Sequence, residues 1–278
     1  MKILYLSLFF TFALISQDME KIPFDSKKPF IKHPNGSPWK LTLSKNWKYK
    51  NFLWKAGKEI EFYITGELFQ AILAENATIN QIYFKEGTEI KLYPNGNLYF
   101  ANLSSNTKVE NVPVLSGTMI KFFEDGKLSG GTLSENFVFE NINYKQGTFL
   151  QFYPNGKIFS GFLAKNTLVD TIPCKENTKI IFKENGKLST AELGETKEFN
   201  SILFPVNTRI NLNTNGNLEE AILLESQSIQ EIPCKGGKYF YVQFYPSGKL
   251  KSCTLSENFT YKKQSYKADD KITLDSND

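Results

Sequence analysis

Histidine is almost absent from this sequence, which contains only His33 among 278 residues. A zinc site built on several histidines is therefore excluded, and a Ser-His-Asp triad would depend on that one residue. His33 stands in the segment KHPNG, and later copies of this segment carry a tyrosine or phenylalanine at the same position. We expect a structural role for His33, and we predict no catalytic residue, no bound metal and no cofactor.

Cysteine is also scarce. Cys174 and Cys234 stand in two copies of the segment IPCK where other copies have an aromatic residue, and Cys253 replaces an alanine or glycine. In a flat sheet with about 4.8 Å per strand, Cys174 lies about 29 Å from Cys234, too far for a disulfide. Cys234 and Cys253 are nearer but two strands apart. We therefore predict three free, mostly buried thiols.

No apolar run is long enough for a transmembrane helix. The run at residues 3–15 follows Lys2 and has about 13 residues, short of the roughly 20 that a spanning helix needs, which disfavours an uncleaved anchor. Its layout is typical of a secretory signal peptide. We predict a signal peptide at residues 1–17, a charged lead-in at residues 18–29, and no transmembrane span after cleavage. The expected location is the periplasm, the cell surface or the extracellular space of a bacterium.

An excess of charge is missing too. The formal net charge is +4, and no basic tail or charged block stands out. Nucleic-acid binding depends on neutralising many phosphates with Lys and Arg. We therefore expect no nucleic-acid partner.

What the sequence does have is a repeat. Glycines at hairpin-like turns recur every thirty residues, and a second turn keeps the same step. Such a period indicates a repeat architecture. We predict one β-repeat domain at residues 30–278 with about eight repeats of thirty residues. The first glycine series is Gly36, Gly66, Gly96, Gly126, Gly156, Gly186 and Gly216.

Each repeat is interpreted as three short strands. Asn95-Gly96 favours a two-residue type I′ turn, and Lys85-Glu86-Gly87 favours a three-residue hairpin loop. Together the two turns predict a wet face with Glu89, Lys91 and Asn102, and an apolar face. The apolar face contains Ile82, Phe84, Ile90, Leu92, Ala101 and Leu103.

The apolar face must be covered. The predicted fold class is therefore all-β, an elongated repeat protein whose three-strand repeats form an antiparallel meander sheet; the alternative is a β-solenoid. A column of small residues, Ala101 and its equivalents, indicates the close approach of a second layer.

The phrase FYPNGKI at residues 152–158 and its copies resemble MORN-type repeats (membrane occupation and recognition nexus) and the related antitoxin-like β-hairpin repeat proteins. The resemblance covers the hairpin part of each repeat, and this sequence departs from it by adding segments such as TLVDTIPCK at residues 167–175. It implies an extended sheet used for binding or scaffolding, with no catalytic residues to transfer.

An aromatic row is the main candidate for partner binding. Its residues recur beside the first turn, on the wet face, and cross-strand pairing with leucines such as Leu68 is the structural alternative. Exposed tryptophans are also common in interfaces, although Trp39 and Trp47 equally suit a capping role at the end of the array. The candidate residues are Trp39, Trp47, Tyr63, Tyr93, Phe123, Tyr153 and Tyr245.

The sequence favours a non-enzymatic exported repeat protein that acts as a binding or structural module at the cell envelope or surface. Its partner would be a protein or a glycan. The alternative is an antitoxin or immunity-type inhibitor that binds a toxin protein. An enzyme acting on polysaccharide would need carboxylates that break the repeat, whereas Glu59, Glu61 and Glu89 lie in ordinary polar columns.

Overall fold

The computed structural model describes residues 22–276. The signal peptide predicted at residues 1–17 therefore lies outside the described residues. Within them, no helix is long and apolar enough to cross a membrane. The chain groups into two compact units, residues 1–132 and 133–278, called unit 1 and unit 2 below. The prediction that residues 30–278 form one domain stays a prediction.

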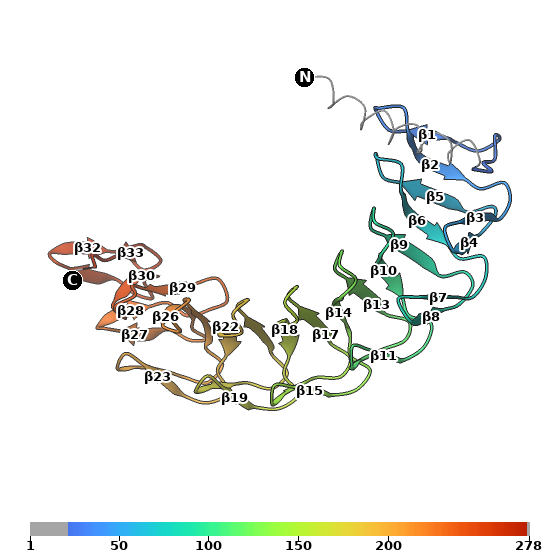
Figure 1. Ribbon diagram of the computed structural model, residues 1–278. Helices are drawn as coiled ribbons and strands as arrows, with labels where there is room; N and C mark the ends of the chain where they lie inside the picture. The colour runs from blue at the N-terminus through green and yellow to red at the C-terminus, as the bar shows by residue number, and fades with distance from the viewer. Residues whose placement is uncertain (1–21, 277–278) are drawn as a thin grey trace, which may run out of the picture. The chain divides into compact units, whose positions relative to one another are not determined.

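Unit 1 contains one antiparallel ladder of long strands, in which each strand pairs with the next along the series (Figure 1). The strands in order are β1 (Ile31–Lys32), β2 (Pro38–Thr42), β5 (Glu59–Phe62), β6 (Leu68–Ile72), β9 (Glu89–Leu92), β10 (Leu98–Asn102), β13 (Met119–Phe122) and β14 (Leu128–Thr132).

Unit 2 repeats the same ladder, again antiparallel at each pairing. The strands in order are β17 (Phe149–Phe152), β18 (Ile158–Phe162), β21 (Lys179–Phe182), β22 (Leu188–Glu192), β25 (Arg209–Leu212), β26 (Leu218–Ile222), β29 (Tyr241–Phe244), β30 (Leu250–Thr254) and β33 (Lys271–Thr273). The predicted all-β antiparallel meander is thus confirmed in each unit.

The segments between the long hairpins form separate short hairpins, drawn in Figure 1 as a second row beside each ladder. Unit 1 has β3 (Trp47–Tyr49) with β4 (Phe52–Trp54), β7 (Ala77–Ile79) with β8 (Ile82–Phe84), and β11 (Thr107–Val109) with β12 (Val112–Val114). Unit 2 has β15 (Phe137–Phe139) with β16 (Ile142–Tyr144), β19 (Thr167–Val169) with β20 (Ile172–Cys174), β23 (Lys197–Phe199) with β24 (Ile202–Phe204), β27 (Gln227–Ile229) with β28 (Ile232–Cys234), and β31 (Phe259–Tyr261) with β32 (Gln264–Tyr266).

Each repeat therefore contributes four strands, and the predicted three-strand repeat is wrong on this point. Ile82 pairs with Ile79 across the short hairpin, not with Ile90, which instead lies between Ala71 and Ala101 in the ladder. The turn after Phe84 leads the chain from the short hairpin into the ladder. The backbone N–H of Gly87 there donates to the carbonyl of Leu73, 2.9 Å away.

Neither predicted turn has the predicted form, and the type I′ loop occurs at a third turn, between β7 and β8. Asn80 and Gln81 both take positive φ, 49° and 64°, so the two-residue type I′ loop joins β7 to β8. At the PNG segment only Gly96 is left-handed, with φ of 90°. The N–H of Tyr93 donates to Asn97 and the N–H of Gly96 donates to Tyr93, which defines a three-residue loop.

The core lies between each ladder and its short hairpins. A Cβ atom added to Gly131 in β14 would lie 2.8 Å from a methyl carbon of Val114 in β12, so the second layer touches the ladder backbone there. The predicted packing role of the small-residue column is thereby explained. The six residues predicted on the apolar face, Ile82, Phe84, Ile90, Leu92, Ala101 and Leu103, are all buried. The single shared face is wrong, because Ile82 and Phe84 belong to the short hairpin that covers the ladder.

Candidate functional site

The face of each ladder that points away from the short hairpins, called the open face here, is the surface available to a partner. A β-bulge recurs on it. Leu98 pairs with Leu92, but the next pair is Phe100 with Lys91, so Tyr99 is an extra residue. Because Leu98 and Ala101 are both buried in the core, Tyr99 and Phe100 both face outward.

In unit 1 the bulge residue is aromatic in three successive repeats, and each ring contacts the ring six positions before it. Trp39 stacks on His33 with ring centroids 5.8 Å apart, at an interplanar angle of 29°. Phe69 meets Tyr63 edge-on at 5.1 Å. Tyr99 lies 4.9 Å from Tyr93. These three ring pairs are called the unit 1 aromatic row.

The earlier residue of each pair also connects neighbouring repeats. The Tyr63 hydroxyl donates to the carbonyl of Leu92, 2.9 Å away, and the Tyr93 hydroxyl donates to Phe122, 3.0 Å away. His33 makes the same contact through Nε2 to the Phe62 carbonyl at 3.0 Å. The structural role predicted for His33 is therefore supported, because it occupies the tyrosine position and makes the tyrosine contact.

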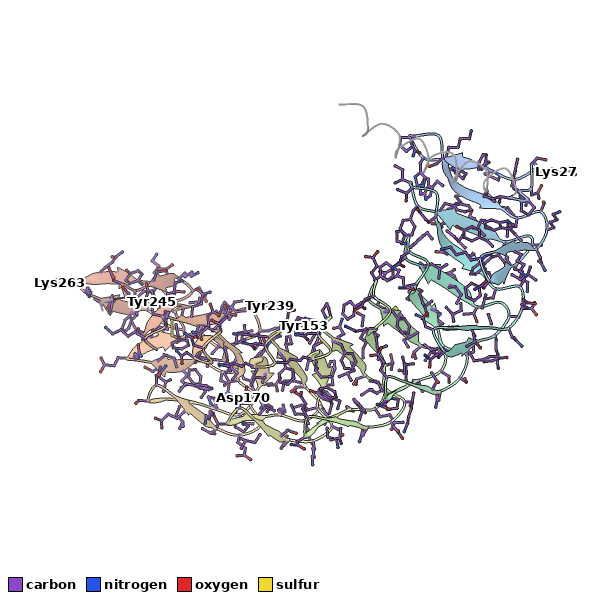
Figure 2. The ribbon with its side chains drawn as sticks, in the orientation of Figure 1. Lys27, Tyr153, Asp170, Tyr239, Tyr245 and Lys263 are labelled. Carbon is purple, nitrogen blue, oxygen red and sulfur yellow. A yellow bond between two sulfur atoms is a disulfide. The ribbon has the colours of Figure 1, made fainter. Side chains whose placement is uncertain are left out.

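Unit 2 makes the same connection through two tyrosines and a lysine. The Tyr153 hydroxyl donates to Phe182 and the Tyr245 hydroxyl donates to Leu274, at 3.0 and 2.8 Å. Figure 2 shows both tyrosines on the side of the long strands, whereas Asp170 lies on the short-hairpin row. Lys183 replaces the tyrosine in the first of the two repeats between them, and its Nζ donates to the Leu212 carbonyl at 2.7 Å. Burial lowers the pKa of Lys183.

The predicted site residues differ in their exposure to solvent and in the layer to which they belong. Trp39 is 44% exposed on the open face, whereas Trp47 is 8% exposed and stacks on Tyr49 in the first short hairpin. Tyr63, Tyr93, Phe123, Tyr153 and Tyr245 are half-buried beside the first turn. Tyr63, Tyr93 and Tyr153 have the bulge residues as ring partners, not Leu68 and its equivalents, which are buried in the core. A binding role for the predicted residues stays a prediction.

Sequence reasoning missed the bulge residues Phe69, Tyr99 and Phe159. The signal was present, because each stands six positions after an aromatic residue that was recognised. It was overlooked because a two-residue turn at Asn95-Gly96 leaves no room for a bulge.

Charged groups border the unit 1 aromatic row. Lys40 Nζ lies 2.9 Å from Glu61 and 3.1 Å from Glu59, and these hydrogen bonds raise its pKa. Lys91 Nζ lies 5.7 Å from the centre of the Phe69 ring and 5.3 Å from that of Phe100. Such distances are typical of cation–π contacts. The open face of unit 1 therefore combines rings with charges of both signs.

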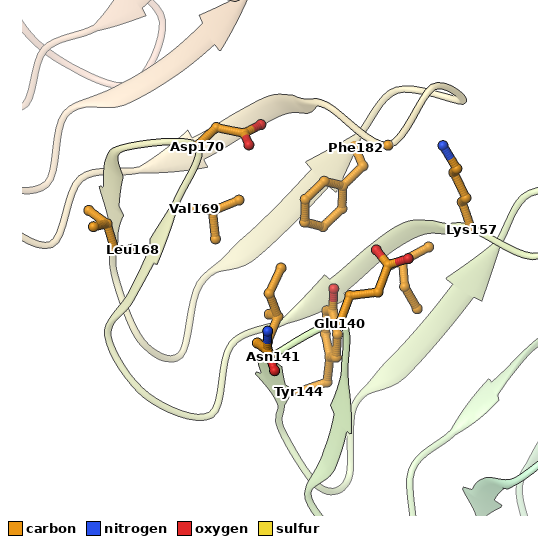
Figure 3. A pocket seen from close by; sticks show the side chains of 11 residues that line it. Glu140, Asn141, Tyr144, Lys157, Leu168, Val169, Asp170 and Phe182 are labelled. Atoms are coloured by element: carbon orange, nitrogen blue, oxygen red, sulfur yellow. The ribbon is translucent and has the colours of Figure 1, made fainter.

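A polar cavity of about 330 Å³ lies in unit 2 where two neighbouring short-hairpin turns meet two ladder loops (Figure 3). Glu140 and Asp170 stand on the two turns, and Lys157 lies on a ladder loop. A cavity of about 440 Å³ occupies the equivalent place in unit 1, with Asn80 and Glu110 on its turns. The cavity is thus a consequence of the repeat.

Acidic residues at these turns accept hydrogen bonds from the backbone of the ladder. Asp170 Oδ2 accepts the backbone N–H of Leu188 at 3.0 Å, and Glu110 Oε1 accepts that of Leu128 at 3.1 Å. Tyr144, also at the unit 2 cavity, has a raised pKa because it is buried and lies near the Glu140 charge. No group of three or more His, Cys, Asp or Glu suited to a metal was found in the described residues.

The cysteine prediction is wrong for two of the three residues. Cys234 in β28 and Cys253 in β30 form a disulfide, with Cα atoms 5.7 Å apart. A flat meander would separate them by two strands, but the short hairpin folds over the ladder and brings them together. Cys174 is free and buried as predicted, and burial raises its pKa to about 12, which leaves it unreactive.

The lysine before the second turn likewise connects repeats. Lys55 Nζ reaches Glu86 at 2.8 Å, and Lys175 Nζ reaches Asn207 at 2.5 Å. Lys235 makes the equivalent ion pair with Asp269. These lysines thus point to the next repeat.

Comparison with known proteins supports the repeat. The MORN repeat variant family matches residues 145–160, which include β17, its turn and most of β18. The resemblance to MORN-type repeats is therefore confirmed for the hairpin part of a repeat. No curated protein matches the sequence. A chain in the structure titled "Crystal Structure of TcdB2-TccC3-Cdc42" is 10% identical, with a TM-score of 0.14, over 79% of this chain. The match spans 13% of that chain's length.

Proposed function

We propose that this protein is an exported, non-enzymatic repeat protein that acts as a binding or structural module at the cell envelope or surface. The observation that carries the export is the Cys234–Cys253 disulfide, because disulfides persist in oxidising compartments and are rare in the cytosol. The apolar run at residues 3–15 supports the same assignment from the other end of the chain.

The binding role is supported by the architecture. The short hairpins cover one face of each ladder and leave the open face to solvent. In unit 1 this face carries the half-buried rings of Phe69 and Tyr99, the exposed ring of Trp39, and charged side chains. Aromatic residues and a mixed polar surround are typical of binding surfaces.

The test combines three measurements on the native host: the mass of the mature N-terminus, protease digestion of intact cells, and the thiol state of the purified chain. We expect a cleaved N-terminus, digestion from outside or after permeabilising the outer envelope, and one free thiol. An uncleaved cytoplasmic chain with three free thiols would overturn the proposal and favour the toxin-inhibitor alternative.

A further inference from the structure

The unit 1 aromatic row has a regular spacing. Its bulge residues lie on β2, β6 and β10, and one intervening strand separates each from the next in the ladder. Two strand steps amount to roughly 9–10 Å. Three rings thus stand in line at equal intervals, a periodic arrangement that suits a periodic polymer better than the single clustered hot spot of a protein interface.

The interval is close to the length of one disaccharide in an extended β-1,4-linked glycan, where alternate sugars present the same face. A pyranose ring has a face of C–H groups, and the negative face of an aromatic ring attracts such positively polarised hydrogens. Each ring of the row would therefore meet one sugar of each disaccharide.

The ring faces can be reached from the open side. Lys40 Nζ already lies 6.0 Å from the Trp39 ring centre, and Lys91 Nζ lies near Phe69. Trp39 is 44% exposed, and Phe69 and Tyr99 are half-buried, so a ligand on the open face can contact all three rings.

The strip beside the row supplies hydrogen-bonding groups. Four residues on neighbouring strands lie opposite one another, each paired with the next: Lys40, Glu61, Gln70 and Lys91. They are half-buried and offer donors and acceptors that suit hydroxyl and amide groups of sugars. Charges of both signs in this strip disfavour an anionic membrane surface, which would select lysines alone.

We propose that the open face of unit 1 binds an extended β-1,4-linked glycan along Trp39, Phe69 and Tyr99, with one disaccharide for each repeat. This inference rests on the proposed function and names its partner class. Phe69 holds the middle position, so it contributes to every bound chain that spans two repeats or more.

The experiment titrates the mature full-length chain with β-1,4-linked hexasaccharides of N-acetylglucosamine and of glucose, measured by calorimetry. Binding of at least one is expected, with affinity rising from disaccharide to tetrasaccharide to hexasaccharide as further rings are engaged. The α-1,4-linked maltohexaose, which does not form an extended ribbon, is the control and is expected not to bind.

The variant Phe69→Ala should weaken hexasaccharide binding about tenfold or more. Its matched control is Phe159→Ala, at the equivalent bulge position in unit 2, where the ring meets Tyr153 edge-on at 5.2 Å. This variant should leave affinity unchanged. Thermal melting of both variants checks that they fold. If Phe69→Ala melts early, Phe69→Leu, which keeps bulk without a ring, is used instead.

Failure of both hexasaccharides to bind, equal losses in the two variants, or affinity independent of length would each overturn the glycan inference. Such an outcome leaves the proposed function intact if the chain is cleaved and exported. Conversely, glycan binding by a chain shown to be cytoplasmic and reduced would overturn the proposed function and keep the surface assignment.

Discussion

Units 1 and 2 have the same strands and core but different open faces. On the open face of unit 1, the cross-strand series that contains Lys40, Glu61 and Lys91 presents charges beside the rings. The equivalent series in unit 2 consists mostly of hydroxyl and amide groups that hydrogen-bond to one another. Ser160 Oγ donates to Gln151 Oε1 at 2.9 Å, and Thr190 Oγ1 donates to Asn211 Oδ1 at 2.9 Å. Ser160 is completely buried. Unit 2 thus satisfies these polar groups with hydrogen bonds between neutral side chains, whereas unit 1 uses ion pairs such as Lys40 with Glu59 and Glu61.

The difference separates scaffold from surface. Core columns must keep shape and register in every repeat, because each short hairpin packs on the ladder of its own repeat. The open face has no such constraint. A binding function can therefore occupy one unit without affecting the fold of the other.

The largest expected effect tests whether the cores are equivalent. Leu103→Asn in unit 1 and Leu163→Asn in unit 2 each place an amide at a buried position, 3% and 0% exposed. We expect each to lower the free energy of unfolding by about 3–5 kcal/mol, from the lost packing and the unpaired amide. Urea unfolding measures both. A loss in one unit several times that in the other would show that the cores differ.

The second prediction concerns the disulfide, which among the described residues occurs in unit 2 alone. Cys234→Ala/Cys253→Ala should cost about 2–4 kcal/mol, because the disulfide restrains a loop of about twenty residues in the unfolded chain. In unit 1 the equivalent positions, Phe84 and Ala101, are held by packing alone.

The control is Cys174→Ala, which removes a buried thiol without a crosslink. Hydrogen exchange should show lost protection at residues 227–255 in the double variant and in the reduced wild type. Unchanged protection there would contradict a stabilising role for the disulfide.

The third prediction concerns how a large residue of the second layer matches a small one in the ladder. A Cβ atom at Gly161 would lie 2.6 Å from Tyr144 Cδ1 and 2.8 Å from Leu150 Cδ1. Gly161→Ala should therefore destabilise unit 2 by about 1–3 kcal/mol. Adding Tyr144→Val to this variant removes the ring. The double variant should therefore lose less free energy of unfolding than the sum of the losses in the two single variants. Additive losses would argue against the contact.

Much of the fold could be predicted from residues that repeat. Gly96 and Gly87 marked the turns, and Ile90 opposite Ala101 gave the correct ladder register. The small-residue column indicated that a second layer approaches, but the segments that form this layer could not be identified. The type I′ turns at Asn80-Gln81 and its equivalents contain no glycine in the described repeats. If that turn is not recognised, the sequence places Phe84 in the ladder and does not predict the contact between Cys234 and Cys253.

The aromatic positions were only half predicted for a related reason. The column of Tyr63 and Tyr93 follows directly from the period. Its partners Phe69 and Tyr99 face outward only because a bulge inserts one residue, and a bulge has no residue signature as strong as a glycine turn.

The fourth prediction concerns the response of unit 1 to alkaline pH. Burial raises the pKa of Tyr63 and of Tyr93 in unit 1 above the ordinary value of 10.0. The folded state therefore holds these protons more tightly than the unfolded chain. Their contribution is fully present below about pH 10 and is lost as pH rises through the folded pKa values. Tyr63→Phe/Tyr93→Phe should flatten this alkaline loss, as followed by urea unfolding at several pH values. An unchanged pH slope would contradict it.

The smallest effect is expected at the edge of unit 1, where His33→Phe replaces a single contact. The variant loses the hydrogen bond from His33 to the Phe62 carbonyl and keeps a ring that can stack on Trp39. Phe123 occupies the same position naturally in a later repeat. Because the site is only half-buried, the loss in the free energy of unfolding should stay below about 1 kcal/mol. His33→Ala, which removes the ring as well, should cost more. A loss above about 2 kcal/mol for His33→Phe would mean that this histidine does more than take the tyrosine's place.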